Sequence, residues 1–436
     1  MLARIRAGRS QRLRRKPMRI LVVSNYYPPY EVGGYEQLCR DVCHRLQARG
    51  HQITVLTSVR GVSDQASPTE PGIHRLLHEQ ISLDAPVITQ FFRQRRQRDQ
   101  HNLASFHHVV GKAGPDVIFL WNLENLGRTL ASAAEGLPNT GVAYWLAGRS
   151  PAEPDVYWDY WNSPGRTRRA TIFKSLLRPL ALRLLASEYQ SQGLRMDYVG
   201  VVSEYMREWL VGKGALPPTA RVIHNGVELD LFPWHERPWD RHKPLRLLQA
   251  GRVSEDKGVH TTVEAMNLLV HRLGLSEMKL VVAGTGPDAY RARLAELVRS
   301  FDIEDQVEFT GWLAREQMPA LMATCDVLIL ATLQNEPLAR VVLEAMASGL
   351  VVVGAVTGGM AEVLQEGVTG LTFAPGSADD LAQQIARLLQ IPTLPHDLTR
   401  MARILVRDEF SLDHMVDQCE HMLIEARDSV CHELVD

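Results

Sequence analysis

The chain has 436 residues, of which 45% are apolar and 22% are charged, and its formal net charge is −2. These values are typical of a globular protein, and the length predicts two domains rather than one. We expect no transmembrane helix, because no apolar run approaches roughly 20 residues. We also expect no secretory signal, because the basic residues 1–17 lack an apolar stretch.

The near-neutral total hides an uneven distribution of charge. Residues 1–226 contain 30 Lys and Arg against 18 Asp and Glu, a net of +12, whereas the remainder contains 18 against 32, a net of −14. Basic clusters occur at residues 4–19, 91–98 and 166–183. The third also contains apolar side chains, which suits a helix lying on an anionic membrane surface. A helix packed on its own domain with a solvated basic face is an equal alternative. Nucleic-acid binding is not expected, because the sequence contains no aromatic–basic recognition module.

In the first half, short apolar runs alternate with amphipathic stretches, as they do in βαβ units. The predicted strands are residues 19–24, 53–57, 116–121, 141–146 and 198–203. A loop with Gly33 and Gly34 follows the first strand and leads into a helix that ends near Arg49. Glycines allow close backbone approach and a helix N-terminus favours phosphate, so the pair is a candidate anion site. A plain turn explains it equally well.

The second half repeats this pattern. The predicted strands are residues 245–250, 279–283, 307–310, 326–331 and 351–354, with a short edge strand at 371–373. Two such series predict two parallel sheets, each covered by helices. The predicted organisation is a basic arm (1–17), a first α/β domain (18–226), a linker (227–244), a second α/β domain (245–408) and a C-terminal helix (409–436).

Neither the cysteines nor the histidines form a recognisable set of metal ligands. The five cysteines are scattered without a CxxC pair, and the 16 histidines include no HExxH motif. This predicts reduced thiols in a cytoplasmic protein without a metal site. The basic clusters add the expectation of a peripheral position at the inner face of the membrane.

Two cations stand in the loop after the strand at residues 245–250. Arg252 and Lys257 are five positions apart and precede a helix predicted from about Val259. Arginine can form paired hydrogen bonds to phosphate oxygens and lysine supplies a compact charge, so the two can converge on a diphosphate. Such cations would stabilise the negative charge that develops when a nucleoside diphosphate departs.

Two carboxylates stand at the strand-to-helix junction after residues 326–331. Glu336 and Glu344 are eight positions apart, which on a helix would be about 12 Å along the axis. A glycosidase pair lies roughly 5–9.5 Å apart, so one shared acid–base centre is disfavoured. Because ligands bind outside the carboxyl ends of strands in open α/β sheets, two contacts along an elongated ligand fit better. Two solvated surface carboxylates are the alternative.

The sequence around these glutamates resembles the E-x7-E signature of retaining glycosyltransferases of family 4, which have the GT-B fold. The other segments that carry the resemblance are residues 341–349, 357–359 and 367–371, with Glu362. The resemblance is closest over residues 245–375, extends to 19–57 and 199–232, and is weak over 60–195, where acceptors bind in that family. It implies two Rossmann-like domains whose parallel sheets face an interdomain cleft, with the last helix crossing back to the first domain.

The resemblance also implies roles for individual residues. Arg252 and Lys257 would hold the diphosphate of a nucleotide sugar, Glu336 would contact the donor sugar, and Glu344 would bind the ribose. Arg252, Lys257 and Glu336 are therefore the expected catalytic residues. Further donor contacts are expected from the backbone at Gly33, Gly34, Leu338, Ala339, Arg340 and Val341. No metal and no cofactor besides the donor are expected.

The chain departs from the family pattern in two places. Pro337 and Ala339 stand where glycines are usual, and Ala147 and Gly148 stand where many members carry His, often followed by Asp. A front-face mechanism, in which the leaving diphosphate accepts the proton of the acceptor hydroxyl, can survive the loss of that His. The residues expected on the acceptor side are Arg149, Asp155, Tyr157 and Asp159.

The predicted function is retaining, metal-independent transfer of a hexose-type sugar from a nucleotide diphosphate sugar to a glycan or a lipid-linked acceptor. The alternatives are a nucleotide-sugar-binding protein with little or no catalysis, and a sugar-nucleotide epimerase of similar architecture. The nucleotide base, the donor sugar, the acceptor and the linkage stay open at this point.

Overall fold

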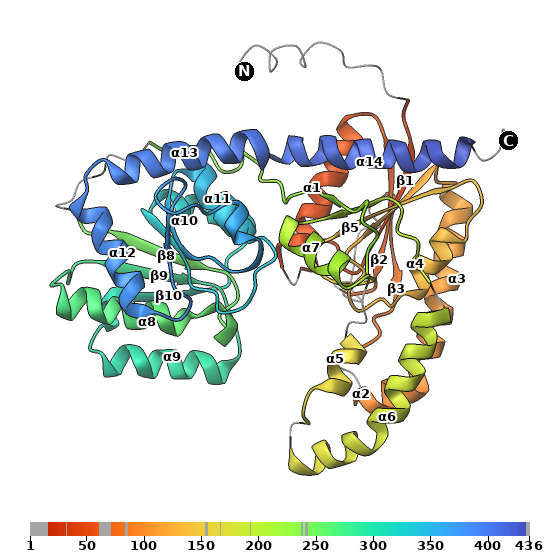
Figure 1. Cartoon of the computed structure of the whole chain (residues 1–436), viewed down its shortest axis with the longest axis horizontal. Coiled ribbons are helices and arrows are strands. Elements are labelled where there is room, and N and C mark those ends of the chain that lie inside the picture. Colours follow the sequence, from red (N-terminus) through yellow and green to blue (C-terminus); the bar gives the residue numbers. More distant parts are fainter. Residues whose placement is uncertain are drawn as a thin grey trace. The chain divides into compact units, whose positions relative to one another are not determined.

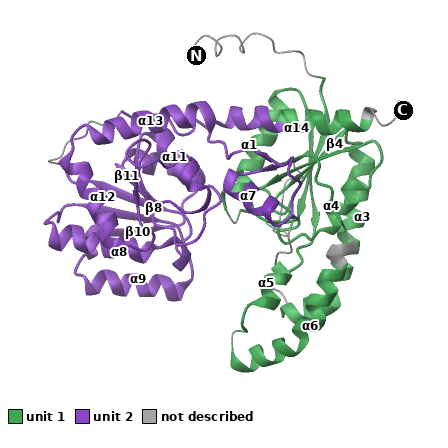
Figure 2. Cartoon of the chain, viewed as in Figure 1, with its two compact units in different colours: residues 1–199, 420–436 green, residues 200–419 purple. Residues whose placement is uncertain are grey.

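The computed structural model describes residues 16–31, 33–60, 71–82, 86–152, 156–165, 167–191, 193–236, 239 and 243–432. Most of the predicted basic arm and the predicted acceptor residue Asp155 lie outside the described residues. The chain divides into two compact units, residues 1–199 with 420–436 and residues 200–419 (Figure 2). The domain limits expected from the sequence stay predictions.

The first sheet has seven strands in the order β3-β2-β1-β4-β5-β6-β7 (Figure 1). Its strands are β1 (Arg19–Ser24), β2 (Gln52–Ser58), β3 (Ile73–Leu77), β4 (Val117–Trp121), β5 (Gly141–Leu146), β6 (Val199–Val201) and β7 (Arg221–Val222). β1 pairs in parallel with both β2 and β4. Every residue of β4 is buried, because the strands of a parallel sheet are covered on both faces.

Helices connect these strands. They are α1 (Gly34–Ala48), α2 (Val87–Thr89), α3 (Arg95–Ala113), α4 (Thr129–Glu135), α5 (Val156–Asn162), α6 (Arg168–Ser191) and α7 (Glu204–Gly212), with the π-helical turn η2 (Gln90–Gln94). The last helix, α14 (Leu412–His432), brings the buried Glu420 to the end of α1, where its carboxylate lies 2.6 Å from Arg49 Nη1 and 3.1 Å from His51 Nε2. A charge buried in this way is retained because it is paired.

The second sheet has six strands in the order β10-β9-β8-β11-β12-β13. They are β8 (Arg246–Ala250), β9 (Lys279–Ala283), β10 (Val307–Gly311), β11 (Val327–Leu330), β12 (Val351–Ala355) and β13 (Leu371–Phe373). The accompanying helices are α8 (Val259–Asn267), α9 (Asp288–Ser300), α10 (Met318–Ala323), α11 (Arg340–Ser348), α12 (Ala378–Gln390) and α13 (Leu394–Glu409). Short helical turns are η3 (Glu255–Lys257), η4 (Leu268–Arg272), η5 (Glu304–Gln306), η6 (Arg315–Gln317) and η7 (Gly358–Glu362).

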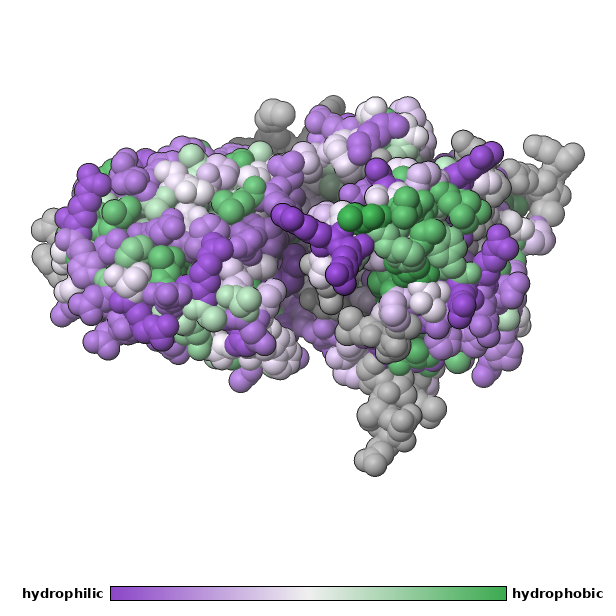
Figure 3. Space-filling view, turned by 90° about the horizontal axis from the view of Figure 1, so that it is seen from below, coloured by the Kyte–Doolittle hydropathy of each residue, from purple (hydrophilic) through white to green (hydrophobic). Residues whose placement is uncertain are grey.

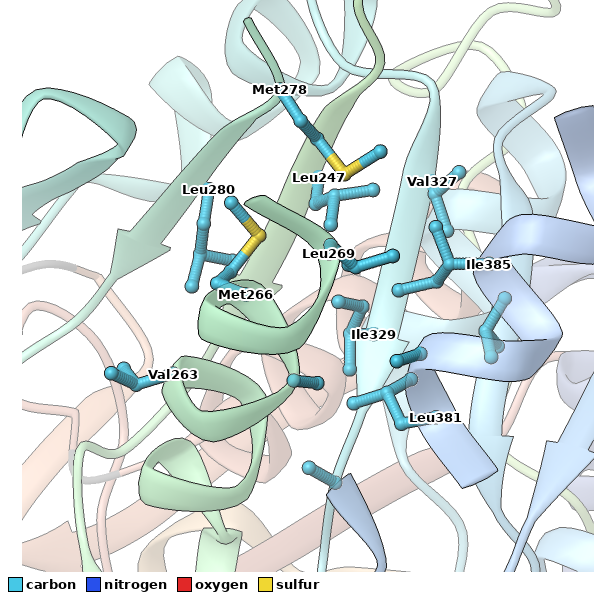
Figure 4. Close-up of a cluster of buried hydrophobic side chains, with 14 of the residues drawn as sticks. Leu247, Val263, Met266, Leu269, Met278, Leu280, Val327, Ile329, Leu381 and Ile385 are labelled. Atoms are coloured by element: carbon cyan, nitrogen blue, oxygen red, sulfur yellow. The ribbon is translucent and has the colours of Figure 1, made fainter. Parts of the chain in front are cut away.

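The core of the second unit forms where α8 and α12 pack on this sheet. On α12, the buried Leu381, Ile385 and Leu388 follow one another at intervals of four and three residues, which is the stripe of an amphipathic helix. Figure 4 labels ten side chains of this core, namely Leu247, Val263, Met266, Leu269, Met278, Leu280, Val327, Ile329, Leu381 and Ile385. The apolar runs of the strands and the helical stripes therefore bury each other.

The predicted fold class, two Rossmann-like α/β domains with parallel sheets, is confirmed by the two sheets. The predicted strands at residues 19–24, 141–146, 279–283 and 371–373 coincide with β1, β5, β9 and β13. β3 and β7 were not predicted, since β3 is a partly buried edge strand with polar residues and β7 has two residues. Among the described helices, none is long and apolar enough to cross a membrane.

Candidate functional site

The candidate residues of the second unit lie in the loops that follow β8, β11 and β12. These strands are neighbours in the sheet, so their carboxyl ends meet at one edge. In open parallel sheets, ligands bind outside that edge. Segments near residues 251–258, 331–339 and 356–362 therefore come together although they are far apart in the sequence.

The loop after β8 is held against the end of β11. Gly258 has a φ of +61°, and a Cβ atom added to it would lie 2.0 Å from the carbonyl oxygen of Ala331. Only glycine combines this backbone conformation with so close an approach. The amide of Leu333 donates to the carbonyl oxygen of Asp256 at 2.8 Å. These contacts fix the backbone on both sides of Lys257.

Lys257 and Glu336 are in direct contact. The ammonium of Lys257 donates a hydrogen bond to Oε2 of Glu336, across a sequence separation of 79 residues. Their side chains are 25% and 14% exposed, so each is largely withdrawn from water but still open to a ligand at one side. Attraction between charges is stronger at such a site than in bulk water.

The segment after β12 supports the backbone of Glu336. The amide of Gly359 donates to the carbonyl oxygen of Glu336 at 2.8 Å. A Cβ atom on Gly358 would lie 2.4 Å from that same carbonyl oxygen, and one on Gly359 would lie 1.9 Å from the carbonyl oxygen of Pro337. Packing therefore explains why both positions are glycine, because any side chain here would displace the loop that contains Glu336.

The helix α11 begins directly after this loop. Its N-cap is Ala339, and the first-turn amides of a helix lack acceptors within the helix, which suits an anion. Asn225, which is fully buried, donates from Nδ2 to the carbonyl oxygen of Leu338 at 2.9 Å and so holds the approach to the helix. One turn further, Glu344 Oε1 lies 3.7 Å from Arg340 Nη2.

Arg252 is the most exposed of the four charged residues predicted for this site. Its side chain is 65% exposed, and Nη2 lies 3.5 Å from Oδ2 of Asp256 in the same loop. An exposed guanidinium with one loose ion pair can turn toward a phosphate group at little cost. The structure thus brings Lys257 and Glu336 into contact. Arg252 lies in the same loop as Lys257, and Glu344 lies on α11, which follows the loop of Glu336.

A further ion pair of this unit was not predicted from the sequence. His224 Nε2 lies 2.8 Å from Oε2 of Glu362, and the amides of Glu204 and Tyr205 at the start of α7 donate to the same carboxylate at 3.0 and 3.2 Å. Burial alone would raise the pKa of Glu362, but these hydrogen bonds outweigh it and hold the pKa below its ordinary value. His224 and Glu362 are 138 residues apart, so no spacing in the sequence could reveal the pair.

The predicted glycine pair belongs to the other unit. Gly33 precedes α1 and Gly34 begins it, and the amide of Gly33 donates to Oε2 of Glu36 at 3.0 Å. This is the backward half of a capping box, which satisfies an amide at the helix start. The local contact supports the turn interpretation, and the role of the two glycines toward a donor stays a prediction.

The residues predicted for the acceptor side also belong to that unit. Arg149 and Asp159 form an ion pair. Tyr157 is buried against Phe91, and its hydroxyl donates to the carbonyl oxygen of Gln80 at 2.6 Å. Tyr157 thus supports the surrounding loops from inside, whereas Arg149 and Asp159 are reachable from solvent.

The second unit also contains a cavity of about 550 Å³ at a different place. It is lined by residues that include Asp326, which precedes β11, and Val351, which begins β12. It therefore lies at the amino ends of these strands and contains none of the predicted site residues. Within the described ranges, no group of three or more His, Cys, Asp or Glu side chains could hold a metal ion.

Comparison with protein families gives two adjoining matches. The model described as "Glycosyltransferase Family 4" matches residues 32–231, and the one described as "Glycosyl transferases group 1" matches residues 234–404. Together the two models account for most of the chain, and the matched ranges contain every predicted site residue.

Two similar curated proteins are a putative glycosyltransferase and a glycogen synthase by name. A putative colanic acid biosynthesis glycosyltransferase of Salmonella typhimurium is 27% identical over 231 residues, which is 52% of this chain and 55% of that protein. A glycogen synthase of Mycobacterium tuberculosis is 26% identical over 408 residues, 90% of this chain and 91% of that protein.

Two solved structures share the fold at 19% sequence identity. The Anabaena protein Alr3699/HepE, in complex with UDP and glucose, has a TM-score of 0.66 and matches over 94% of this chain and 100% of its own. The sucrose-phosphate synthase of Thermosynechococcus elongatus has a TM-score of 0.69 over 94% and 99%. At this identity the likeness concerns the fold alone.

Proposed function

The chain is a glycosyltransferase of the GT-B fold, and we propose that it transfers a sugar from a nucleotide diphosphate sugar with retention of the anomeric configuration. The acceptor is a glycan or a lipid-linked molecule, and the reaction needs no metal ion. The chain acts at the cytoplasmic face of a membrane. Arg252 and Lys257 bind the diphosphate, Glu336 contacts the sugar, and Glu344 contacts the ribose.

The observation that carries this proposal is the contact between Lys257 and Glu336. A donor has its anomeric carbon directly next to its diphosphate, so the groups that bind the two must be adjacent. Lys257 donates to the carboxylate of Glu336, and both stand at the carboxyl edge of the second sheet. Arg252 is in the same loop as Lys257 and adds a second cation for the diphosphate.

The transfer reaction requires mainly that the site stabilise the developing charges and position the reacting groups. The bond between the anomeric carbon and the diphosphate oxygen breaks, and the acceptor oxygen forms its bond on the same face of the sugar. The departing diphosphate gains negative charge, which Arg252 and Lys257 stabilise, and it takes the proton of the acceptor hydroxyl. The carboxylate of Glu336 stabilises the positive charge that develops at the anomeric carbon.

This division of work needs no general base from Ala147 or Gly148. Proton transfer to the leaving group requires no titratable side chain, so catalysis rests on electrostatic stabilisation and positioning. The named ligands of the Anabaena structures, UDP with glucose and UDP-glucose, make uridine donors the first to test.

The first experiment measures binding and turnover with purified full-length protein. A panel of nucleotide sugars that includes UDP-glucose is screened by thermal shift, since a ligand of the folded state raises the unfolding temperature by mass action. With the selected donor and an extract of glycans and lipid-linked glycans as acceptor, Lys257→Met is expected to lower kcat by about 10²–10³-fold. Glu336→Gln should also lower kcat, whereas Glu344→Gln should mainly weaken nucleotide binding.

Matched controls exist in the same unit. Lys279 lies at the amino end of β9, where its ammonium donates to the carbonyl oxygen of Asp305, and Lys279→Met should leave turnover unchanged. Glu308→Gln on β10 is the corresponding control for the glutamates. The anomeric configuration of the product is read by NMR, and inversion would contradict the proposed mechanism. Donor binding without acceptor-dependent release of nucleoside diphosphate would instead identify a binding protein.

A further inference from the structure

One helix of the chain turns an apolar face to solvent. In α6, Ile172, Phe173, Leu176 and Leu180 have relative exposures of 64%, 55%, 74% and 54%. Ile172, Leu176 and Leu180 recur at intervals of four residues, and Phe173 lies three residues before Leu176, so the four share one side of the helix. Figure 3 shows apolar surface gathered over this part of the molecule, with hydrophilic surface around it.

The opposite side of α6 is already packed. Ala181 and Leu185 are buried in a cluster with Phe91, Tyr157 and Trp161 from the neighbouring turns and helices. The inward side of the helix is therefore occupied by this cluster. Among the described residues, no element covers the outward stripe. The exposed stripe is therefore a stable feature of the helix and not the result of an unpacked segment.

Polar anchors fix the rotation of α6 about its axis. The ammonium of Lys174 donates to the carbonyl oxygen of Ser163 at 2.5 Å and lies 4.1 Å from the centre of the Tyr160 ring. Arg178 Nη2 donates to Oδ1 of Asn162 at 2.6 Å. Because these cations bind the end of α5, the helix cannot roll its apolar stripe inward without breaking them.

The charges around the stripe have a single sign. Between residues 160 and 187 the sequence has six Lys and Arg and no Asp or Glu. Arg169 stands three residues before Ile172 and Arg183 stands three residues after Leu180, and both arginines are exposed. The apolar stripe thus has a cation at each end on the same side of the helix.

We infer that this stripe of α6, from Arg169 to Arg183, docks the protein on an anionic lipid surface. A helix with this pattern lies in the interface plane, with its apolar side chains at the boundary of the acyl chains and its arginines at the phosphates. None of these residues is among those assigned to donor binding. The inference makes the proposed position at a membrane specific and does not depend on the proposed transfer reaction.

A second copy of the chain fits the stripe less well. In a two-fold symmetric contact between two α6 helices, an antiparallel arrangement brings Arg169 against Arg183, and a parallel one brings each arginine against its own copy. Both arrangements oppose like charges at the ends of the apolar contact. Anionic headgroups satisfy the same arginines, which is why the charges favour the bilayer.

The test is co-sedimentation of the full-length protein with vesicles. The vesicles consist of phosphatidylcholine alone or with about one third phosphatidylglycerol, and binding is expected only to the anionic kind. The double variant Ile172→Gln with Leu176→Gln should lower the partition coefficient by about tenfold or more, because two exposed apolar side chains lose their burial in lipid. Glutamine keeps helix propensity, so the fold is preserved.

Two control variants distinguish vesicle binding through α6 from non-specific binding to vesicles. Leu273→Gln with Met401→Gln removes exposed apolar side chains of the other unit and should leave vesicle binding unchanged. Arg169→Gln with Arg183→Gln should also weaken binding by about tenfold, whereas Arg272→Gln with Arg291→Gln should not.

Three results would overturn the inference. The first is a wild-type protein that does not bind anionic vesicles, and the second is a set of α6 variants that bind these vesicles as well as wild type does. The third is light scattering that shows a dimer for wild type and a monomer for the apolar double variant. The last would assign the stripe to self-association. Lys257→Met should retain vesicle binding and the α6 variants should retain donor binding, so failure of either proposal is recognised without the other.

Discussion

At the scale of single residues, the candidate site depends on backbone positions as much as on charged groups. Lys257 reaches Glu336 because the next residue, Gly258, lets its loop lie against the end of β11. The φ of +61° and the 2.0 Å approach to Ala331 are two separate demands on that position. An alanine there has to adopt a left-handed conformation and also displace a carbonyl oxygen.

Gly258→Ala is therefore expected to destabilise the protein more than conformational strain alone would. Gly274 supplies the matched control, because it has a φ of +70° and open space around its Cβ position. Gly274→Ala should cost about 1 kcal/mol and Gly258→Ala about 2–4 kcal/mol of unfolding free energy, measured by urea denaturation. Equal losses in the two variants would show that the close approach to Ala331 has no energetic weight.

At the scale of elements, Glu362 joins η7 to α7. Its carboxylate accepts from the first amides of α7 and from His224, so it caps one helix from another segment. A carboxylate at a helix N-terminus satisfies free amides and interacts favourably with the helix dipole. The same contacts lower the pKa of Glu362, which links the capping to pH.

The stabilisation from Glu362 is expected to disappear in acid. A carboxyl group whose pKa is lower in the folded than in the unfolded protein contributes stability that is present above about pH 4.5 and lost as the pH falls through the folded-state pKa. The difference in unfolding free energy between wild type and Glu362→Gln should be largest near neutral pH and shrink below about pH 4.5.

The measurement is urea denaturation of both proteins at a series of pH values. Glu316→Gln, which changes an exposed carboxyl on η6, is the comparison variant. A difference between wild type and Glu362→Gln that is constant from neutral to acidic pH would contradict the capping role.

At the scale of the whole molecule, the uneven charge predicts that vesicle binding and donor binding differ in their sensitivity to salt. Residues 227–436 carry a net charge of −14, yet they contain Arg252 and Lys257. The long-range field there does not attract an anionic nucleotide, so donor binding must rest on short-range contacts. Docking of the basic α6 on lipid, in contrast, uses attraction between exposed charges, which salt screens.

Raising the ionic strength from about 0.1 to about 1 M shortens the Debye length from about 10 to about 3 Å. Vesicle binding is expected to fall by more than about tenfold over this range, while the donor KM changes by less than about threefold. Co-sedimentation and steady-state kinetics at matched salt concentrations give the comparison. A donor KM that rises in parallel with the loss of vesicle binding would show that long-range charge governs both.

Apart from β3 and β7, the strands of both sheets could be located from the sequence, because buried parallel strands are continuous apolar runs with glycine-containing loops after them. The four charged residues of the candidate site were also predicted from the sequence, since the spacing of Arg252 with Lys257 and of Glu336 with Glu344 resembles a known signature, and their joint role stays a prediction. The partly polar β3 and the two-residue β7 left no such pattern.

Contacts between residues that are far apart in the sequence became visible in the folded protein. The contacts of Lys257 with Glu336 and of His224 with Glu362 span 79 and 138 residues, and no local periodicity encodes them. The structure also shows that one apolar side of α6 is exposed. A helical pattern states which residues share a side of a helix, but whether another element covers that side is settled only when the chain has folded.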